Sequence, residues 1–576
     1  MELESSSNFQ DTAGSGGSEK ETFTRRFFLS RSIRIGSGAA LISSMPALLD
    51  ACSSSGRKTS TQSTRLSSST SVGIGLGTPK RGGTLRMGTF SEVDSFSPIT
   101  GQWDTTGYLY GETVYDPLVA FAPDGSPKPY LAQTITPSPD YTMWTITLRP
   151  GVLFHDGTPL DSQALYQNLS LQLQSFLTGP ALANISSLKI SGPLSVDVYM
   201  NEPWVPFPYY LADQPGYIAA PSMLNSKATT PTPVGTGPFV YEQWEPNVKF
   251  VAKANQHYWR TGLPYLGSIE FRPFDSPASM SASLLSGQLD AATSTDQSTI
   301  AYFQKQASYV VVDDLDQGIV LPDQNCVILN VTKPPVDDIR VRQALAYSID
   351  KQKIVDSAFS GMGAVSNGPF VEGSKYYSDT GYPQYDINKA RSLVHEYTSQ
   401  VGPIELSLGV PAGNQTYTQV AELLQSIWQQ IGITSKISEA EYTVYVANAA
   451  LGNYMVNGWQ QFGCNDPDEN YVWWSTDTIK PDGQISLNVA RNSDPAIQKA
   501  LTTGRTSPDQ ATRIQAYQTV AQRLAVDLPY LWINRSVSAV IASPRVENFN
   551  ATTFPDGSPG EGVSGGTFRF STTWLA

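Results

Sequence analysis

The chain has 576 residues, and at about 100–200 residues per domain this length predicts two to four lobes rather than one simple core. Its 38 basic and 51 acidic side chains give a net charge of −13, which argues against a nucleic-acid coat or a polybasic membrane binder. Apolar residues make up 40% of the chain and charged residues only 15%, a composition typical of a globular protein. Three cysteines and three histidines leave little room for a structural metal, so we expect neither a metal ion nor a cofactor.

The first 52 residues have the features of an export leader. Arg25 and Arg26 precede two phenylalanines, and a weakly apolar run extends over 35–49. Glycine and proline interrupt this run, which is too short to span a membrane as a helix of about 20 residues. The leader resembles a twin-arginine signal, and the alternative is a basic patch before a core helix. The run ends in Leu-Asp-Ala-Cys, which resembles a lipobox and predicts lipidation of Cys52, although Asp50 departs from the usual small or aliphatic residue.

Residues 53–80 are rich in serine and threonine and predict a flexible linker, because such a composition cannot bury a core. A lipid on Cys52 with this tether would hold the protein at the outer face of the cytoplasmic membrane. We therefore expect an exported protein, anchored on the periplasmic side of the cell envelope. The remaining Cys326 and Cys464 are compatible with one disulfide or with two isolated thiols.

In chain order, the first clear element is a strand over 141–148, where apolar and polar residues alternate. A βαβ unit is predicted further on, with strands at 405–410 and 433–437 and an amphipathic helix between them that ends near Gly432. Another helix is expected to begin at Ser507 as N-cap, with Pro508 in its first turn. The mature chain therefore reads as mixed α/β, with a β-rich first part and βαβ character in the second.

Two segments partly match motifs that are catalytic or metal-binding in other proteins, but neither has the complete sequence context of its motif. Residues 562–566 match the Gly-x-Ser-x-Gly pattern, but no strand and helix flank them and no histidine follows, so a turn is expected. The acidic run 466–470 lacks the glycine and the glutamate of a calcium loop and is better interpreted as a helix-capping turn. We expect no catalytic residue. A paired-carboxylate glycosidase remains the enzyme alternative, although nothing singles out two of the 51 carboxylates.

An ordered set of segments runs through the chain from about residue 80 to residue 540. The segments are 82–86, 94–98, 112–119, 148–159, 233–239, 255–259, 329–350, 385–391 and 458–468. The most specific is Pro-Val-Gly-Thr-Gly-Pro-Phe at 233–239, followed by Asn-Gln-His-Tyr-Trp at 255–259. Together they resemble the family 5 extracellular solute-binding proteins of ABC transporters, the group that includes dipeptide and oligopeptide binders.

The resemblance implies a two-lobed α/β fold of the periplasmic-binding-protein-like type II, with an additional β-rich subdomain in lobe I. Lobe I would comprise 80–325 and 536–576, and lobe II would comprise 326–535. The ligand would lie between the lobes, and a hinge motion would trap it because it binds the closed form better than the open form. The closed form, expected to be a monomer, would then dock on the permease.

The resemblance also points to two ligand-contacting loops. The first contains Gln102, Trp103 and Asp104, and its indole offers flat contact area and one N–H, with a core anchor as the alternative for Trp103. The second runs over 458–466. From it and from the start of the lobe II helix we expect contacts by Gly458, Trp459, Gln460, Gln461, Phe462, Asp466 and Asn414.

Two charged groups that would clamp a dipeptide are missing. In α-peptide binders an aspartate follows the loop tryptophan by three residues, whereas this chain has Phe462 there. Some dipeptide binders also place an arginine before the lobe II helix, and 410–415 contains none. Because a buried charge without a partner costs several kcal/mol, a free dipeptide is disfavoured and a neutral polar ligand is favoured.

We therefore expect a substrate-binding lipoprotein of an ABC importer that captures an oligopeptide-like solute and delivers it to the membrane permease and its ATPase. An oligosaccharide-binding member of the same family is the runner-up. A secreted glycosidase, or a surface sensor or adhesin without a transport role, would also be compatible with the sequence. No nucleic-acid partner is expected.

Overall fold

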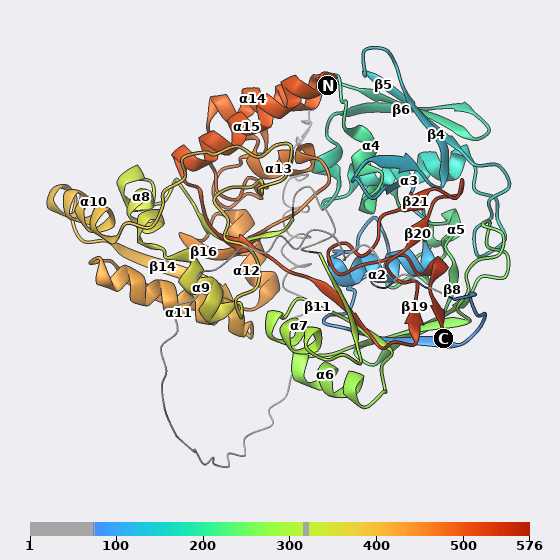
Figure 1. Cartoon of the computed structure of the whole chain (residues 1–576). Coiled ribbons are helices and arrows are strands. Elements are labelled where there is room, and N and C mark those ends of the chain that lie inside the picture. The colour runs from blue at the N-terminus through green and yellow to red at the C-terminus, as the bar shows by residue number, and fades with distance from the viewer. Residues whose placement is uncertain (1–72, 74, 76, 315–321) are drawn as a thin grey trace, which may run out of the picture.

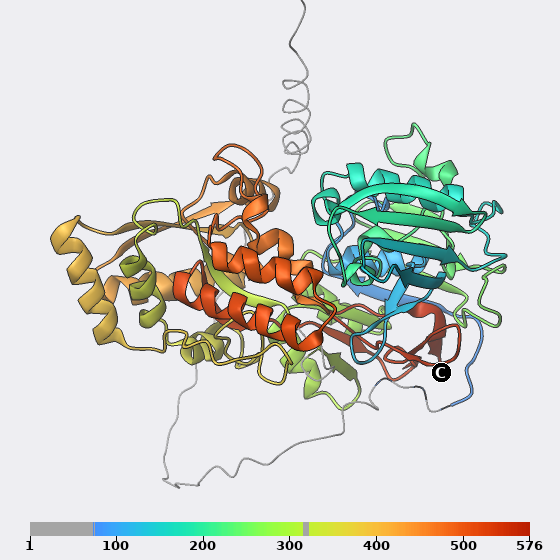
Figure 2. The same cartoon turned by 90° about the horizontal axis from the view of Figure 1, so that it is seen from above.

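The computed structural model describes residues 73, 75, 77–314 and 322–576. The predicted leader, Cys52 and nearly all of the linker lie outside the described residues. Figures 1 and 2 show two halves. The larger half contains a seven-stranded sheet in the order β12-β18-β11-β1-β10-β9-β8 and a four-stranded sheet in the order β4-β5-β7-β6, and the smaller half contains a five-stranded sheet in the order β15-β14-β16-β13-β17.

The seven-stranded sheet combines segments from both ends of the chain. Its strands are β1 (Thr84–Thr89), β8 (Phe239–Glu245), β9 (Lys249–Ala254), β10 (Ser268–Pro273), β11 (Ala291–Ser294), β12 (Val310–Asp313) and β18 (Ala539–Ala542). β1 is parallel to β10 and β11, and β18 lies antiparallel between β11 and β12. Helix α2 (Thr105–Val114) buries Leu109, Tyr110 and Val114 in the same core as this sheet, while α6 (Pro277–Leu285) and α7 (Gln297–Gln304) pack near β11 and β12.

The four-stranded sheet forms the β-rich part of the larger half. Its strands are β4 (Ala132–Pro137), β5 (Met143–Leu148), β6 (Ile185–Gly192) and β7 (Ser195–Met200), and α3 (Ser162–Gln174) packs on it. The alternation predicted for β5 is confirmed, because Trp144, Ile146 and Leu148 are buried and their neighbours are half-buried. The strand begins later than predicted, since Tyr141 has a φ of 57° and belongs to the preceding turn.

The smaller half confirms the predicted βαβ unit. β14 (Glu405–Pro411) is followed by α11 (Gln415–Gln430) and by β15 (Thr434–Ala440), which pairs with β14 in parallel. β16 (Val456–Gln461) lies parallel to β14, and β13 (Gln324–Leu329) lies antiparallel between β16 and β17 (Tyr530–Arg535). The other long helices are α8 (Ile339–Ser348), α9 (Lys351–Ala358), α10 (Ile387–Gln400), α12 (Tyr442–Leu451), α14 (Pro495–Thr506) and α15 (Gln510–Asp527).

The predicted start of α15 was wrong by two residues. Ser507 is the C-cap of α14, and Asp509 is the N-cap of α15, where its Oδ2 accepts a hydrogen bond from the Thr512 N–H at 2.8 Å. Two helices thus meet at this turn, and the sequence pattern alone did not separate the end of one from the start of the next.

The chain passes between the halves twice, once between β12 and β13 and once between β17 and β18. The described ends of the two crossings are hydrogen-bonded to each other. The Asp314 N–H donates to the Ser538 carbonyl at 3.1 Å, and the Ser538 N–H donates to Asp314 Oδ1 at 3.1 Å. The Ser536 N–H donates to the Asp323 carbonyl at 2.8 Å. The described ends of the first crossing, at Asp314 and Asp323, therefore lie next to the second crossing.

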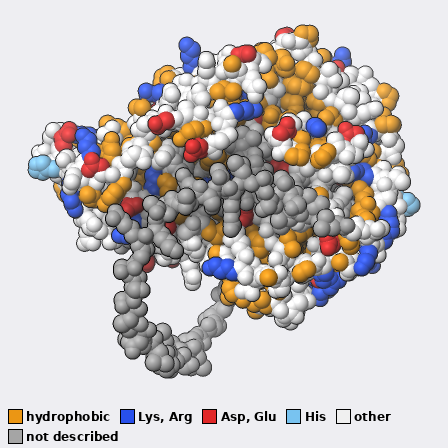
Figure 3. Space-filling model, in the orientation of Figure 1, with side chains coloured by type: hydrophobic (Ala, Val, Ile, Leu, Met, Phe, Trp, Pro, Cys, Tyr) orange, Lys and Arg blue, Asp and Glu red, His pale blue; other side chains and the backbone are white. Residues whose placement is uncertain are grey.

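Several smaller expectations are also settled. Ser564 and Thr567 form an isolated bridge, and Gly565 and Gly566 have positive φ angles, which confirms a turn over the Gly-x-Ser-x-Gly match. Cys326 and Cys464 are free thiols. Among the described helices, none is long and apolar enough to cross a membrane. On the face shown in Figure 3, acidic and basic side chains are interspersed.

Candidate ligand-binding site

The first predicted loop packs its tryptophan onto helix α2. Trp103 is half-buried, and its Nε1 donates to the Ser95 carbonyl at 3.2 Å. Gly107 and Gly111 leave room for the ring, since a Cβ on Gly111 would lie 2.7 Å from Trp103 Cζ3 and one on Gly107 would lie 2.8 Å from Trp103 Cβ. The indole N–H is therefore already committed inside the protein, and only part of the ring surface remains for a ligand.

The two neighbours of Trp103 differ in how far they are engaged. Gln102 has an exposed side chain, and its backbone N–H donates to Asp94 Oδ1 at 2.9 Å. Asp104 is the N-cap of α2, where Oδ1 accepts from the Gly107 N–H at 2.9 Å and Oδ2 accepts from Ser91 Oγ at 3.0 Å. The carboxylate of Asp104 thus stabilises the start of the helix. The Gln102 side chain is exposed, and only the backbone N–H of this residue is engaged in the hydrogen bond to Asp94.

The first part of the second predicted segment forms strand β16. Side chains alternate between the two faces of a strand, so residues predicted to contact the ligand together point to opposite faces of the sheet. Trp459 and Gln461 point to one face of the sheet and are 8% and 3% exposed. Gln460 points to the other face, where its Nε2 donates to the Asp323 carboxylate at 2.5 Å. Gly458 has no side chain, and a Cβ there would lie 2.8 Å from the Tyr417 ring. The sequence placed these four residues in one loop, whereas the structure places them in a strand.

The loop after β16 presents Phe462 and encloses Asp466. Phe462 is 49% exposed and packs against Trp473, with ring centroids 5.3 Å apart. Asp466 is fully buried, forms an ion pair with Arg513 Nη2 at 2.6 Å, and begins the short helix η4 (Pro467–Asn470) in a capping box with Glu469. The helix-capping interpretation of this run is confirmed. The expectation that Asp466 meets a ligand is not supported in this conformation, because Arg513 and the helix start occupy its carboxylate.

Asn414 is exposed at the start of α11. Its Oδ1 accepts a hydrogen bond from the Tyr417 N–H at 3.1 Å, so its side chain caps the helix. Its location before α11 agrees with the sequence expectation, but its carbonyl oxygen is already engaged.

Charged groups of the two halves influence each other near the first loop and α2. Desolvation raises the pKa of Tyr108, and the negative charges of Asp213 and Glu469 add to this shift. Asp213 comes from the larger half and Glu469 from the smaller half, and desolvation raises the pKa of both carboxyl groups. Desolvation also raises the pKa of Tyr442 at the start of α12, with a further contribution from the charge of Asp104. Asp104 of the first loop and Tyr442 of α12 are therefore close enough for the charge of one to act on the other.

A buried polar cluster joins the two halves next to the second loop, and sequence reasoning missed it. We call it the Asp468 cluster, and its members are Asp468 and Arg505 from the smaller half and Trp204 and Tyr210 from the larger half. Trp204 Nε1 donates to Asp468 Oδ2 at 2.8 Å, Tyr210 Oη donates to the Asp468 carbonyl at 2.6 Å, and Arg505 Nε donates to Asp468 Oδ1 at 2.9 Å.

The Asp468 cluster is desolvated throughout. Asp468 and Trp204 are 0% exposed, and the side chain of Arg505 is 10% exposed. The Arg505 guanidinium also lies over the rings of Trp204 and Tyr471, at 5.0 Å and 3.6 Å from their centroids. The Asp-Pro-Asp run was visible in the sequence, but its partner Trp204 lies 264 positions away.

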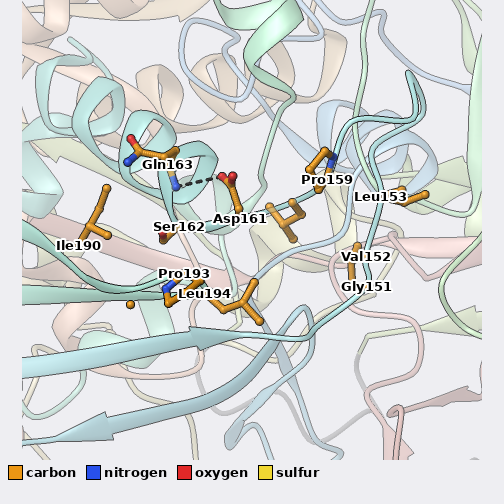
Figure 4. Close-up of a pocket in the computed structure, with 12 residues that line it drawn as sticks. Gly151, Val152, Leu153, Pro159, Asp161, Ser162, Gln163, Ile190, Pro193 and Leu194 are labelled. Atoms are coloured by element: carbon orange, nitrogen blue, oxygen red, sulfur yellow. Dashed lines mark hydrogen bonds between the residues drawn. The ribbon is translucent and has the colours of Figure 1, made fainter.

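A separate pocket lies in the β-rich part of the larger half (Figure 4). It has a volume of about 530 Å³ and lies between the 151–163 segment and the 190–194 turn. Asp161 in its wall is the N-cap of α3 and accepts from the Gln163 N–H at 3.0 Å. None of the predicted ligand residues lines it. Among the described residues, no group of three or more His, Cys, Asp or Glu side chains is arranged to hold a metal ion.

Comparison with known proteins places this architecture in a family. Residues 126–482, more than half of the chain, match the bacterial extracellular solute-binding proteins, family 5. The nickel-binding periplasmic protein of Escherichia coli K12 is 26% identical over 477 residues, covering 78% of this chain and 89% of that protein. The glutathione-binding protein GsiB of Salmonella paratyphi A is 29% identical over 401 residues, covering 69% and 75%.

Solved structures show the same fold. The binding protein AgaA from A. tumefaciens R10, in complex with agropinic acid, has a TM-score of 0.75 at 23% identity, with coverage of 86% of this chain and 99% of that one. The oligopeptide-binding protein AppA from Bacillus subtilis, in complex with a nonapeptide, has a TM-score of 0.73 at 19% identity, covering 87% and 100%. The predicted type II periplasmic-binding-protein-like fold is confirmed. The chain therefore belongs to the family 5 bacterial extracellular solute-binding proteins, which serve ABC transporters.

Proposed function

We propose that this protein is the substrate-binding lipoprotein of an ABC importer and captures an oligopeptide-like solute between its two halves. The observation that carries the proposal is the direct contact between the two halves beside the second loop, where Trp204 and Tyr210 of the larger half donate hydrogen bonds to Asp468 of the smaller half. A solute held on both surfaces would stabilise the closed arrangement, because it gains contacts with both halves only there. The two halves would be the predicted lobes, 80–325 with 536–576 and 326–535.

The amides and aromatic rings on these surfaces support a neutral polar ligand. Gln102 is exposed on one side and Phe462 is exposed on the other. The only carboxylate predicted in the second loop, Asp466, is neutralised by Arg513. A free dipeptide, which needs a partner for each of its charged ends, fits such surfaces less well than a longer peptide held through its backbone.

Anchoring belongs to the same proposal. The twin-arginine leader would direct export, a lipid on Cys52 would hold the monomeric protein at the outer face of the cytoplasmic membrane, and the closed form would deliver its solute to the permease and ATPase subunits. The names of the relatives describe binding proteins, which supports a binding role over the glycosidase alternative.

Thermal-shift measurements test the ligand class. A solute that binds only the folded protein raises its unfolding temperature in proportion to RT ln(1 + [L]/Kd). We expect a shift with peptides of four to eight residues and none with simple dipeptides or maltooligosaccharides. A clear shift with Ala-Ala would contradict the argument from missing charged partners, and a shift with the sugars alone would favour the oligosaccharide alternative.

Membrane fractionation tests the anchor. We expect the wild-type protein in the membrane fraction and a Cys52→Ala variant in the soluble fraction, because the acyl chains would supply the binding free energy. A Cys52→Ala variant that remains membrane-bound would refute the lipid anchor without affecting the solute-binding proposal.

A further inference from the structure

A second, polar pocket lies where the predicted linker joins the larger half. It has a volume of about 480 Å³, and its walls come from residues between 75 and 81, from the 261–265 turn, and from the C-terminal part of the chain around Asn548 and Trp574. A cavity of this size is large enough for a small ligand. None of the ligand residues predicted from the sequence lines it.

This linker pocket lies at the other end of the seven-stranded sheet from the first predicted ligand loop. β1 and β10 run parallel, and Arg81 and Tyr265 come shortly before their first residues, Thr84 and Ser268. The first loop follows the end of β1. Since a strand rises about 3.3 Å per residue, the six residues of β1 place about 20 Å of strand between the pocket and that loop. The linker pocket is therefore a different site from the proposed solute site.

Arg81 brings a positive charge to the wall of the linker pocket. Its Nη2 donates to the Gly262 carbonyl at 2.6 Å, its Nη1 donates to the Pro264 carbonyl at 3.4 Å, and the guanidinium lies 5.6 Å from the centre of the Tyr265 ring. The two carbonyls orient the guanidinium without neutralising it, and no ion pair joins Arg81 to a carboxylate in the described part of the chain. None of the described lining residues is acidic. The remaining N–H groups of Arg81 are thus available to an anion.

A buried tryptophan adds an unpaired donor to the linker pocket. Trp574 belongs to β22 (Trp574–Leu575), which pairs with β19 (Val546–Glu547) near the C-terminus (Figure 1). It is 4% exposed and lines the pocket, and its indole N–H has no acceptor among the residues that the structure describes. Buried tryptophan N–H groups usually have a partner, because an unpaired one loses its hydration without compensation. Gly75 leaves the space beside this N–H open, since a Cβ there would lie 3.0 Å from Trp574 Nε1.

Two side-chain acceptors in the walls of the linker pocket are already engaged. Asn548 Oδ1 accepts from the Gly75 N–H at 3.2 Å, and Thr553 Oγ1 accepts from Arg260 Nη2 at 2.9 Å. Arg260 thereby places a second guanidinium behind the pocket wall. The linker pocket consequently offers positive charge and hydrogen-bond donors, which is the complement of an anionic ligand.

We propose that the linker pocket is a second ligand site, which takes a phosphate ester. Arg81 forms charge-assisted hydrogen bonds to the phosphate, and the Trp574 N–H donates to another of its oxygens. A phosphate suits donors from two separate segments because its acceptor oxygens point in several directions, and arginine is well matched to them. A phospholipid headgroup and a free sugar phosphate both carry this group, and the experiment separates the two sources.

Isothermal titration calorimetry on the full chain measures binding to the linker pocket, with glycerol 3-phosphate as the probe. Glycerol is the neutral comparison, and acetate is the comparison with a planar carboxylate. We expect binding of glycerol 3-phosphate, no binding of glycerol, and at least tenfold weaker binding of acetate, because neither comparison offers the set of charged oxygens that a phosphate does.

Two variants test the assigned donors. Arg81→Gln removes the charge at an exposed position, and Trp574→Phe keeps an aromatic ring but removes the N–H. Each should bind glycerol 3-phosphate at least tenfold more weakly, with an unchanged circular dichroism spectrum. Arg391→Gln is the matched control, because Arg391 is an exposed arginine of α10 in the smaller half that also donates to a backbone carbonyl. It should bind as the wild-type protein does.

Vesicle sedimentation identifies the source of the phosphate. The Cys52→Ala form of each protein is mixed with phosphatidylglycerol vesicles, so that a lipid on Cys52 cannot contribute. Sedimentation with the vesicles that is lost in Arg81→Gln and retained in Arg391→Gln would support the site with a lipid headgroup as its ligand. Calorimetric binding of glycerol 3-phosphate without vesicle binding would support the site with a free phosphate ester.

Three results would overturn the proposal. One is the absence of binding to both glycerol 3-phosphate and the vesicles. Another is equal binding by the wild-type protein, Arg81→Gln and Trp574→Phe, which would place the bound phosphate elsewhere. The third is equal affinity for acetate and glycerol 3-phosphate, which would remove the phosphate class. Each of these results would leave the proposed solute capture standing, because that site lies at the other end of the sheet.

Discussion

Replacing Asp468 with asparagine should destabilise the protein by about 3–5 kcal/mol, the range for removing one partner of a buried ion pair. The structure explains the size of the effect. The Asp468 carboxylate is fully buried and accepts hydrogen bonds from Arg505 Nε at 2.9 Å and Trp204 Nε1 at 2.8 Å. Asparagine keeps the shape of the side chain but leaves the Arg505 guanidinium, whose side chain is 10% exposed, without its counter-charge.

The matched control is Glu242→Gln. Glu242 forms an ion pair with Lys253, but both side chains are well exposed, at 40% and 65%. Solvent-exposed pairs contribute about 0–1 kcal/mol, so the same carboxylate-to-amide change should cost less than about 1 kcal/mol here. The difference between the two variants isolates the effect of burial.

Urea unfolding measures both variants. The free energy of unfolding is extrapolated to water from transitions followed by circular dichroism and by tryptophan fluorescence, and it is read only where the two probes coincide. The double variant Asp468→Asn with Arg505→Met should recover part of the loss, because it removes the charge that the single variant leaves unpaired.

A loss below about 1 kcal/mol for Asp468→Asn would refute this account, since such a value is typical of an exposed pair. The account would also be refuted if the loss of stability in the double variant equalled the sum of the losses in Asp468→Asn and Arg505→Met measured singly. Free-energy changes add in this way for independent sites, whereas those of two directly interacting partners do not.

Further predictions concern four other residues. Gly111→Ala should destabilise the protein by about 1–2 kcal/mol in urea unfolding, because the added Cβ would lie 2.7 Å from Trp103 Cζ3. The cost of this overpacking exceeds the gain in helix propensity from replacing glycine with alanine. An unchanged free energy of unfolding would contradict this prediction and show that the indole ring moves aside without cost. Desolvation lowers the pKa of Lys351 to about 7, below its value in the unfolded chain, so the unfolded state binds more protons above pH 7. Wild-type stability should therefore rise between about pH 7 and pH 10 relative to Lys351→Met, and parallel pH profiles of the two proteins would contradict this. Alkylation in urea without reductant should modify both Cys326 and Cys464, as measured by peptide mass, and protection of the pair would reveal a disulfide.

Local sequence patterns predicted those elements whose stability depends on near neighbours. The alternation of Trp144, Ile146 and Leu148 predicted β5, and the amphipathic stretch with Gly432 after it predicted α11 and its end. The capping role of Asp466 was visible for the same reason, since its partner Glu469 is three residues away. The start of α15 was misplaced because serine and aspartate are both good N-caps and only the end of α14 decides between them.

The sequence by itself determined the α/β class, the βαβ unit and, through its ordered motifs, the solute-binding family. Only the tertiary structure decided which predicted site residues are available. β16 turns Trp459 and Gln461 to one face and Gln460 to the other, Arg513 neutralises Asp466, and Trp204 completes the Asp468 cluster from 264 positions away. The reason is physical: hydrogen-bond partners and burial arise from packing between distant segments, and side-chain spacing along the chain does not encode those contacts.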